Sequence, residues 1–259
     1  MNSKTQVFYT TDLLIFGIDS RKTSNTRSLP KKYFSILLVK RNKEPFINSW
    51  CLPGGYINID ETSKEASNRV LTKETGLTDV YMQQLKVNDE VTRDPRGRTI
   101  SVSYMALIDR TLLENTLREE ASWFDIEIEE QEDLYTIKLT NTEDTISYQV
   151  KRNAIDLKSE EYNYDVIEDN NLAFDHAKLI AEGIMELRNK VNNTDIVFNL
   201  MPQEFTIGEL KQVYELLLNK TLVNSAFRRT IADKVILTDK MIKTGGHRPS
   251  ILCKYNEKR

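Results

Sequence analysis

The sequence is poor in cysteine, histidine and long apolar runs. Among its 259 residues are only two cysteines, Cys51 and Cys253, and two histidines. Two cysteines so far apart argue against a disulfide framework and against a paired-cysteine zinc site, and they suit a reducing compartment. No apolar run approaches the roughly 18 residues of a membrane span, and no basic and apolar leader opens the chain. We therefore expect a cytoplasmic protein without a membrane partner.

The composition is otherwise ordinary, but the charge is unevenly distributed. Charged residues make up 29% of the chain, which suits one large globular domain or two smaller ones with a core of their own. From residue 205 onward, eleven Lys/Arg stand against five Asp/Glu, a net charge of +6, so the remaining residues carry −9 of the total of −3. Residues 114–169 are the acidic extreme. Either the basic end meets a polyanion, or the chain has two solvated faces of opposite sign.

The first part of the chain alternates strands with helices. Apolar and β-branched runs predict strands at residues 6–19, 33–42, 80–91 and 99–109, and a hairpin of residues 134–140 and 145–151. Thr62 and Glu65 form a capping box that begins a helix, and Gly76 ends it. Apolar residues at a helical period predict another helix over 171–191.

The last part of the chain has the order of a winged helix-turn-helix. Thr206 and Glu209 form a second capping box before IGELKQVYELLLN, and NSAFRRTIADKV predicts a short second helix capped by Asn224 or Ser225. Two strand-like runs, VILTDKMIK and SILCKYN, follow and are joined by the Gly-Gly turn of TGGHRPS. Helix, turn, helix and a hairpin with a basic tip make up this motif.

In that motif the second helix enters the major groove of DNA. Arg side chains suit guanine and Asn suits adenine, whereas the flanking basic residues suit phosphate or the minor groove. The alternative is a small protein-binding module with ordinary surface charges. The predicted DNA-binding residues are Lys220, Thr221, Asn224, Arg228, Arg229, Lys243, His247 and Arg248.

Residues 52–77, LPGGYINIDETSKEASNRVLTKETGL, resemble the Nudix hydrolase signature. In that signature a Gly is followed by five residues and then a Glu. After seven more residues comes the run Arg-Glu-apolar-x-Glu-Glu-x-Gly-apolar. The resemblance implies an α/β fold, specifically an α/β/α sandwich with a mixed sheet between helices. The fixed positions that this chain fills in register are Gly55, Glu61, Arg69, Leu71, Glu74, Gly76 and Leu77.

The metal-binding part of the signature is degenerate. In active members three glutamates of this helix bind divalent cations, and their spacing puts them on one face. Those positions hold Val70, Lys73 and Glu74 here, so the formal charge of the trio goes from −3 to 0. Magnesium takes oxygen ligands, and one carboxylate is too few for the cluster. We therefore predict no catalytic residues, no metal and no cofactor, with residual hydrolysis as the alternative.

A pocket without the metal can still bind a nucleotide. Residues 93–104, RDPRGRTISVSY, resemble the stretch that lies along the substrate cleft of ADP-ribose-type Nudix proteins. Forked Arg donors suit phosphates, and aromatic rings can stack on a base or ribose. Taken locally, the stretch is equally well read as a basic hairpin turn in which Asp94 pairs with an Arg. The predicted effector-binding residues are Arg41, Trp50, Tyr56, Glu74, Arg93, Arg96, Arg98 and Tyr104.

The order of four segments resembles the Nudix-related transcriptional regulators, the NrtR family. These segments are the degenerate signature, RDPRGRTISVSY, NLAFDHAKLI, and the terminal FTIGELKQVYE with AFRRTI and GGHRPSIL. The resemblance implies a homodimer whose Nudix domain senses a metabolite and whose winged helices bind operator DNA. The domains it predicts are an effector-sensing Nudix-like domain at 1–170, a linker helix at 171–194 and a winged helix-turn-helix at 195–259.

Many NrtR members control genes of NAD metabolism and respond to ADP-ribose, and a related branch responds to arabinose. The resemblance therefore implies a repressor of NAD-metabolism genes that senses ADP-ribose or a related nucleotide. Two alternatives remain open: a sugar-responsive regulator of the same family, and a Mg²⁺-dependent ADP-ribose pyrophosphatase.

Overall fold

A computed structural model describes residues 6–22, 29–113, 117–156, 158, 161–167, 171–243 and 249–258. The chain divides into two compact units. The first contains residues 1–16, 35–107 and 113–185, and the second contains 17–34, 108–112 and 186–259. None of the helices in the described ranges is long and apolar enough to cross a membrane.

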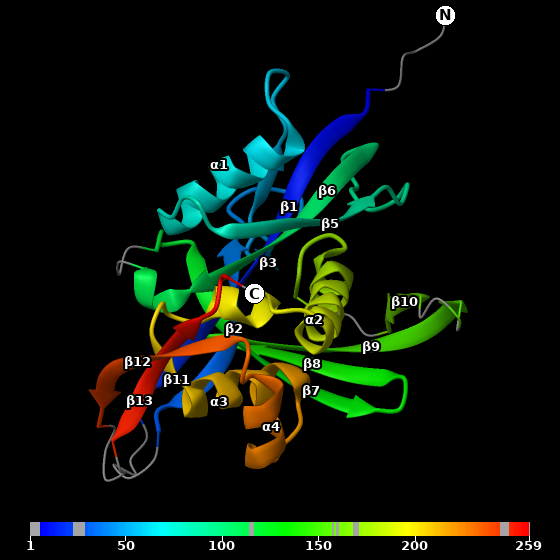
Figure 1. Cartoon of the computed structure of the whole chain (residues 1–259). Coiled ribbons are helices and arrows are strands. Elements are labelled where there is room, and N and C mark those ends of the chain that lie inside the picture. The colour runs from blue at the N-terminus through cyan, green and yellow to red at the C-terminus, as the bar shows by residue number, and fades with distance from the viewer. Residues whose placement is uncertain are drawn as a thin grey trace, which may run out of the picture. The chain divides into compact units, whose positions relative to one another are not determined.

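The central feature is one large sheet, with strand order β10-β9-β8-β7-β2-β1-β6-β5 (Figure 1). Two short strands pair beside this path, β3 with β2 and β4 with β1. Strand β1 buries eight consecutive residues, Thr11–Ile18, as a strand covered on both faces does. The strands of the first half of the chain are β1 (Phe8–Arg21), β2 (Lys31–Lys40), β3 (Trp50–Cys51), β4 (Gly54–Tyr56), β5 (Tyr81–Asn88) and β6 (Thr99–Asp109), followed by the 3-10 turn η1 (Arg110–Leu112).

Two helices, α1 (Ser63–Thr75) and α2 (His176–Asn193), cover opposite faces of the sheet. Ser67 of α1 bonds Thr11 of β1 at 2.5 Å, whereas Gly183 of α2 lies directly against the Leu14 side chain. Side chains an odd number of positions apart on a strand point to opposite faces, so Thr11 and Leu14 place the two helices on opposite sides. The predicted α/β/α sandwich is confirmed, and a Cβ at Gly183 would force the Leu14 side chain to move.

The acidic stretch extends the sheet rather than forming a separate insert. Its strands are β7 (Ala121–Gln131), β8 (Leu134–Thr140), β9 (Thr145–Asp156) and β10 (Glu161–Val166), and Figure 1 shows β7, β8 and β9 side by side. The predicted hairpin of β8 and β9 is confirmed, but β7 and β10 were not predicted. Burial alternates along β8 and β9, so Tyr135 and Tyr148 enter the core while charged residues face outward.

Local sequence signals determine the ends of α1. The Thr62 side chain accepts from the Glu65 N–H, and the Glu65 carboxylate accepts from the Thr62 N–H at 2.8 Å. Gly76 ends the helix at φ 72°, in the left-handed region that favours glycine. Both predictions, the capping box and the C-cap, are confirmed.

The C-terminal part of the second unit is a winged helix, as the sequence predicts. Its core contains Phe198, which packs on Phe205 and Tyr255, and the ring pair Tyr214–Phe227 at 5.3 Å. The expected cap of the second helix is wrong, because Val223 occupies the N-cap position without a side-chain hydrogen bond. Its elements are η2 (Ile196–Leu200), β11 (Phe205–Thr206), α3 (Ile207–Leu218), α4 (Asn224–Thr230), β12 (Val235–Ile242) and β13 (Ser250–Tyr255), with sheet order β11-β13-β12.

The predicted domain boundaries of 1–170, 171–194 and 195–259 stay a prediction, because the two compact units divide the chain along other lines. Residues 17–34 and 108–112 group with the C-terminal residues, and helix α2 continues from the first unit into the second. Within the second unit, Leu29 lies against Gly208 and the Lys32 ammonium is 3.5 Å from the Glu209 carboxylate. These tertiary contacts between distant segments were not visible in the sequence.

The cap of α3 can be tested by substitution. Thr206→Ala removes the acceptor for the Glu209 N–H at 3.2 Å, so we expect the free energy of unfolding to fall by about 1 kcal/mol. Urea titration measures this free energy. Thr230→Ala is the control, because its exposed hydroxyl only donates back to the Ala226 carbonyl; it should change stability by less than about 0.5 kcal/mol. Equal losses in both variants would contradict the capping role.

Candidate functional site

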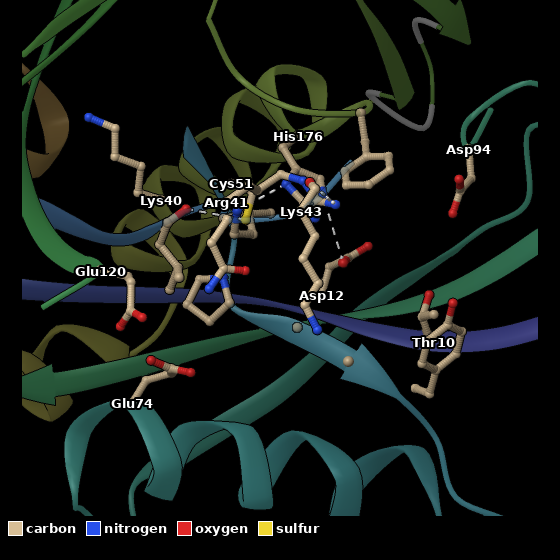
Figure 2. A pocket seen from close by; sticks show the side chains of 18 of the residues that line it. Thr10, Asp12, Lys40, Arg41, Lys43, Cys51, Glu74, Asp94, Glu120 and His176 are labelled. Atoms are coloured by element: carbon tan, nitrogen blue, oxygen red, sulfur yellow. Dashed lines mark hydrogen bonds and ion pairs between the residues drawn. The ribbon is translucent and has the colours of Figure 1, made fainter. Parts of the chain in front are cut away.

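A cavity of about 370 Å³ lies in the first unit, beside the Gly54–Gly55 segment and the C-terminal part of α1 (Figure 2). Its lining contains more positive than negative side chains, which suits an anionic ligand. The cations are Lys40, Arg41, Lys43, Lys73, Arg93, Arg96 and Arg118. The carboxylates are Asp12, Glu44, Glu74, Asp94 and Glu120.

A buried guanidinium holds one side of the cavity. Arg93 Nη2 donates to Asp12 Oδ2 and to Asp175 Oδ1, each at 2.8 Å, and Arg93 Nε donates to Asp175 Oδ2 at 2.9 Å. The Arg93 side chain is 5% exposed. Burial alone would raise the pKa of Asp12, but the neighbouring His176, Arg93 and Ser101 hold it well below its ordinary value. Two guanidinium nitrogens of Arg93, Nε and Nη2, therefore already donate hydrogen bonds to carboxylates of the same chain.

His176 and Cys51 also line the cavity, and Figure 2 shows His176 near Asp12. The Leu52 N–H donates to His176 Nδ1 at 2.9 Å, so Nδ1 carries no proton, and Nε2 lies 3.6 Å from Asp12 Oδ1. His176 is buried, which agrees with a packed histidine rather than a catalyst. Burial raises the pKa of the Cys51 thiol to about 11, so it is no nucleophile at neutral pH.

The Phe174 ring and two nearby guanidinium groups form another wall of the cavity. The Arg41 guanidinium carbon lies 4.7 Å from the centre of the Phe174 ring, and that of Arg96 lies 5.4 Å from it. Phe174 has φ 57°, a left-handed conformation that costs a residue with a Cβ roughly 1–2 kcal/mol. Arg96 also pairs with Asp94 at 2.7 Å, and Arg41 donates to the Pro45 carbonyl. Both cations are thus oriented, with part of each donor set still available to a ligand.

The glycine loop and its signature residues support the cavity mouth. A Cβ on Gly54 would lie 2.6 Å from the Thr11 carbonyl oxygen, so only glycine fits there. Arg69 donates to the Glu61 carboxylate and to the Tyr56 carbonyl. The Glu61 carboxylate therefore holds Arg69, which in turn holds the backbone of the loop at Tyr56.

The residues of this cavity do not fit a divalent metal cluster. Val70 is buried, and the Glu74 carboxylate lies 3.3 Å from the Lys73 ammonium and 3.1 Å from the Arg118 guanidinium. A divalent cation at Glu74 would meet two positive charges instead of two further carboxylates. Among the residues described, no group of three or more His, Cys, Asp or Glu side chains could hold a metal ion.

The structure brings together five of the eight predicted effector-binding residues. Those that line the cavity are Arg41, Tyr56, Glu74, Arg93 and Arg96. The other three are not part of its lining and contact other groups. The Trp50 indole N–H donates to Asp144 at 2.9 Å, the Tyr104 hydroxyl is 2.8 Å from that of Ser63, and Arg98 donates to the Asp89 carbonyl.

Sequence reasoning missed several lining residues. Lys40 and Lys43 flank Arg41, and their position at the end of a buried strand was a signal that could have found them. Arg118 and Glu120 lie in the acidic stretch, where nothing local distinguishes them. Arg118 reaches Glu74 across 44 positions of the sequence, a contact only the tertiary fold reveals.

The second unit presents a polar surface around α4. Phe227 is the buried residue of this helix, so Asn224, Arg228 and Arg229 are all exposed. Lys220, Thr221 and Lys243 are exposed as well, whereas His247 and Arg248 lie outside the described residues. An open groove beside the turn before α4 adds further positive charge; its lysines are Lys31, Lys32, Lys211 and Lys220.

Family models match both parts of the chain. The Nudix domain model matches residues 27–140, and the model of the NrtR DNA-binding winged helix domain matches residues 197–254. Together they cover the Gly54–Gly55 segment, α1, every element from α3 to β12, and β13 as far as residue 254.

Individual relatives point the same way. The chain is 27% identical over 252 residues to the ADPR responsive transcriptional repressor NtrR of Acinetobacter baylyi, covering 95% of this chain and 81% of that protein. Over 92 residues it is 38% identical to an ADP-ribose pyrophosphatase of Methanocaldococcus jannaschii, covering 35% of this chain and 54% of that enzyme.

A solved structure shares the fold of both parts. Shewanella oneidensis NrtR complexed with a 27mer DNA aligns with a TM-score of 0.68 at 24% identity, over 96% of this chain and 93% of that chain. The chain thus contains a Nudix domain followed by a winged helix domain of the NrtR type, and it is similar along nearly its whole length to an NrtR-type repressor.

Proposed function

We propose that this protein is a transcriptional repressor that binds operator DNA through its winged helix and responds to ADP-ribose or a related nucleotide in its Nudix cavity. The observation that carries the proposal is the presence, in one chain, of an exposed polar α4 and a cation-rich Nudix cavity that does not fit a metal cluster. The Acinetobacter repressor, similar over 95% of this chain, supports the same pairing of roles.

The DNA-binding part of the proposal rests on α4. Because Phe227 alone anchors this helix in the core, its remaining side chains are available to the major groove. Arg228 and Arg229 can each present a forked donor pair to guanine, and Asn224 can bind adenine. Lys220 and Thr221 precede the helix and line the groove with its other lysines, and Lys243 follows β12; these side chains would contact phosphates without reading sequence.

The effector part rests on the charge and shape of the cavity. The diphosphate of ADP-ribose carries two negative charges, which match the excess of cations in the lining. Arg41 and Arg96 offer forked donors beside Phe174, and Tyr56 offers a half-exposed ring. A neutral sugar would leave these charges without a partner, so the lining favours the nucleotide over a pentose.

A pyrophosphatase is the competing function, favoured by the likeness to the Methanocaldococcus enzyme over 92 residues. Hydrolysis by a Nudix site needs metal ions that neutralise the diphosphate and activate a water. Here Lys73 and Arg118 surround the single remaining carboxylate, Glu74. We therefore favour binding without cleavage.

In this proposal the protein acts as a homodimer, because operator symmetry mirrors protein symmetry. The nucleotide controls DNA binding by its different affinity for the DNA-competent and the incompetent arrangement of the dimer. The proposed targets are genes of NAD metabolism, as the family resemblance implies.

Fluorescence anisotropy tests the proposal. Labelled DNA from upstream of the protein's own gene is titrated at fixed salt, with and without ADP-ribose, because each phosphate contact contributes a slope of roughly 0.9 in log affinity against log salt. We expect specific binding whose affinity ADP-ribose changes. Specific binding that ADP-ribose leaves unchanged would contradict the effector assignment, and absence of specific binding would contradict the repressor itself.

The role of α4 can be tested in the same assay. Arg228→Ala should weaken specific binding by about 1–3 kcal/mol, because one forked contact to a base is lost. Arg152→Ala is the charge-matched control; Arg152 pairs with Asp133 on the sheet of the first unit, and its loss should leave DNA affinity unchanged. If both variants bind like the wild type, Arg228 makes no base contact.

The absence of hydrolysis is a separate prediction. Full-length protein incubated with ADP-ribose and Mg²⁺ should release no AMP above a protein-free blank, because the cavity lacks the carboxylates that hold the metal. Chromatography of the nucleotides measures this. AMP release that requires Mg²⁺ and stops with EDTA would instead establish the pyrophosphatase.

A further inference from the structure

Lys73, Arg118 and Glu120 form a cluster of charged side chains around Glu74. The Glu74 side chain is 4% exposed, its Oε1 accepts from Arg118 Nη1 at 3.1 Å, and the Lys73 ammonium lies 3.3 Å from the same oxygen. Arg118 Nη2 also donates to Glu120 Oε2 at 3.1 Å. All four side chains line the cavity, and Figure 2 shows Glu74 and Glu120 together above α1, away from Asp94.

The two cations can reach a ligand without leaving the cluster. The Lys73 side chain is 59% exposed and that of Arg118 34%, whereas Glu74 between them is buried. Lysine presents three rotatable donors on a flexible stem, and arginine presents a rigid fork that matches phosphate oxygens. A bound diphosphate can therefore accept hydrogen bonds from both while Glu74 keeps them in place.

We propose that Lys73 and Arg118 take the place of the divalent cations, so that the cavity binds the diphosphate of a nucleotide without metal. This inference rests on the proposed function of the cavity. Both side chains neutralise phosphate oxygens, as a metal does, but neither binds and ionises a water molecule. Replacement of the metal by these two side chains explains how a Nudix cavity can hold the nucleotide and leave its diphosphate bond intact.

The position of each cation argues for this role over simple loss of the glutamates. Lys73 occupies one of the three metal-binding positions of the signature, and Arg118 reaches the remaining carboxylate from a different segment, 44 residues away. Lys73 and Arg118 together carry the two positive charges of one divalent ion, and the lining as a whole keeps more cations than carboxylates.

Isothermal titration calorimetry of ADP-ribose into the full-length protein tests the inference. We expect the same affinity in EDTA and in Mg²⁺. Lys73→Met should weaken binding in EDTA about tenfold, since one charge-assisted contact is lost, and Arg118→Met should do the same. Lys73→Arg should restore most of the affinity, because it keeps the charge. Lys64→Met, an exposed lysine on α1 outside the cavity lining, is the matched control and should bind like the wild type.

Each other result overturns the inference in a recognisable way. Binding that requires Mg²⁺ would show that a metal is still needed, and would leave the repressor and its effector standing. Metal-independent binding that Lys73→Met and Arg118→Met leave unchanged would show that other cations hold the diphosphate. Failure to bind ADP-ribose in both buffers would overturn this inference and the proposed effector together, while leaving DNA binding to be judged by anisotropy.

Discussion

Arg93 donates to Asp12 on β1 and to Asp175 just before α2, and the geometry of the cavity depends on this buried contact. Removing one partner of such a pair leaves an uncompensated charge in the interior, at a cost of about 3–5 kcal/mol. Asp12 in turn accepts from Ser101 and lies beside His176, which accepts the Leu52 N–H just before the glycine loop. The folded-state pKa of Asp12 lies below its unfolded value, so its stabilising contribution is complete at neutral pH and is lost only as the solution becomes strongly acidic.

The cations of the cavity therefore divide into two kinds. Arg93 is buried and holds the chain together, whereas Arg41, Arg96, Lys73 and Arg118 are at least partly accessible to a ligand. This division lets a Nudix fold lose its metal ligands without losing a charged cavity. Helix α2 begins beside Asp175, and its last residues belong to the second unit, so the chain itself continues from the cavity region to the unit that carries the winged helix.

The sequence was sufficient wherever the signal is local. Thr62 with Glu65 and Thr206 with Glu209 form the predicted capping boxes because cap and partner lie three residues apart. The signature glycines and the order of the winged helix elements are likewise local patterns. β7 was missed because its glutamates face outward and mask the buried Phe124 and Ile126.

The site was harder to predict than the fold because its chemistry depends on partners distant in sequence. The rings of Trp50 and Tyr104 are of types that can stack on a nucleotide, but the fold buries both. The Trp50 indole N–H is hydrogen-bonded to Asp144, and the Tyr104 hydroxyl is hydrogen-bonded to Ser63. Arg93 was expected to meet a phosphate and meets two carboxylates more than 80 positions away. Arg118 carries no local signal.

The central claim is that the cavity and the winged helix are thermodynamically coupled, and coupling is reciprocal. The most direct test measures the affinity of ADP-ribose for the free protein and for its saturated complex with specific DNA, at the same salt. If the cavity and the winged helix are coupled, the two affinities differ, and their ratio equals the factor by which ADP-ribose changes the affinity for DNA. An ADP-ribose affinity that is the same with and without DNA would contradict it.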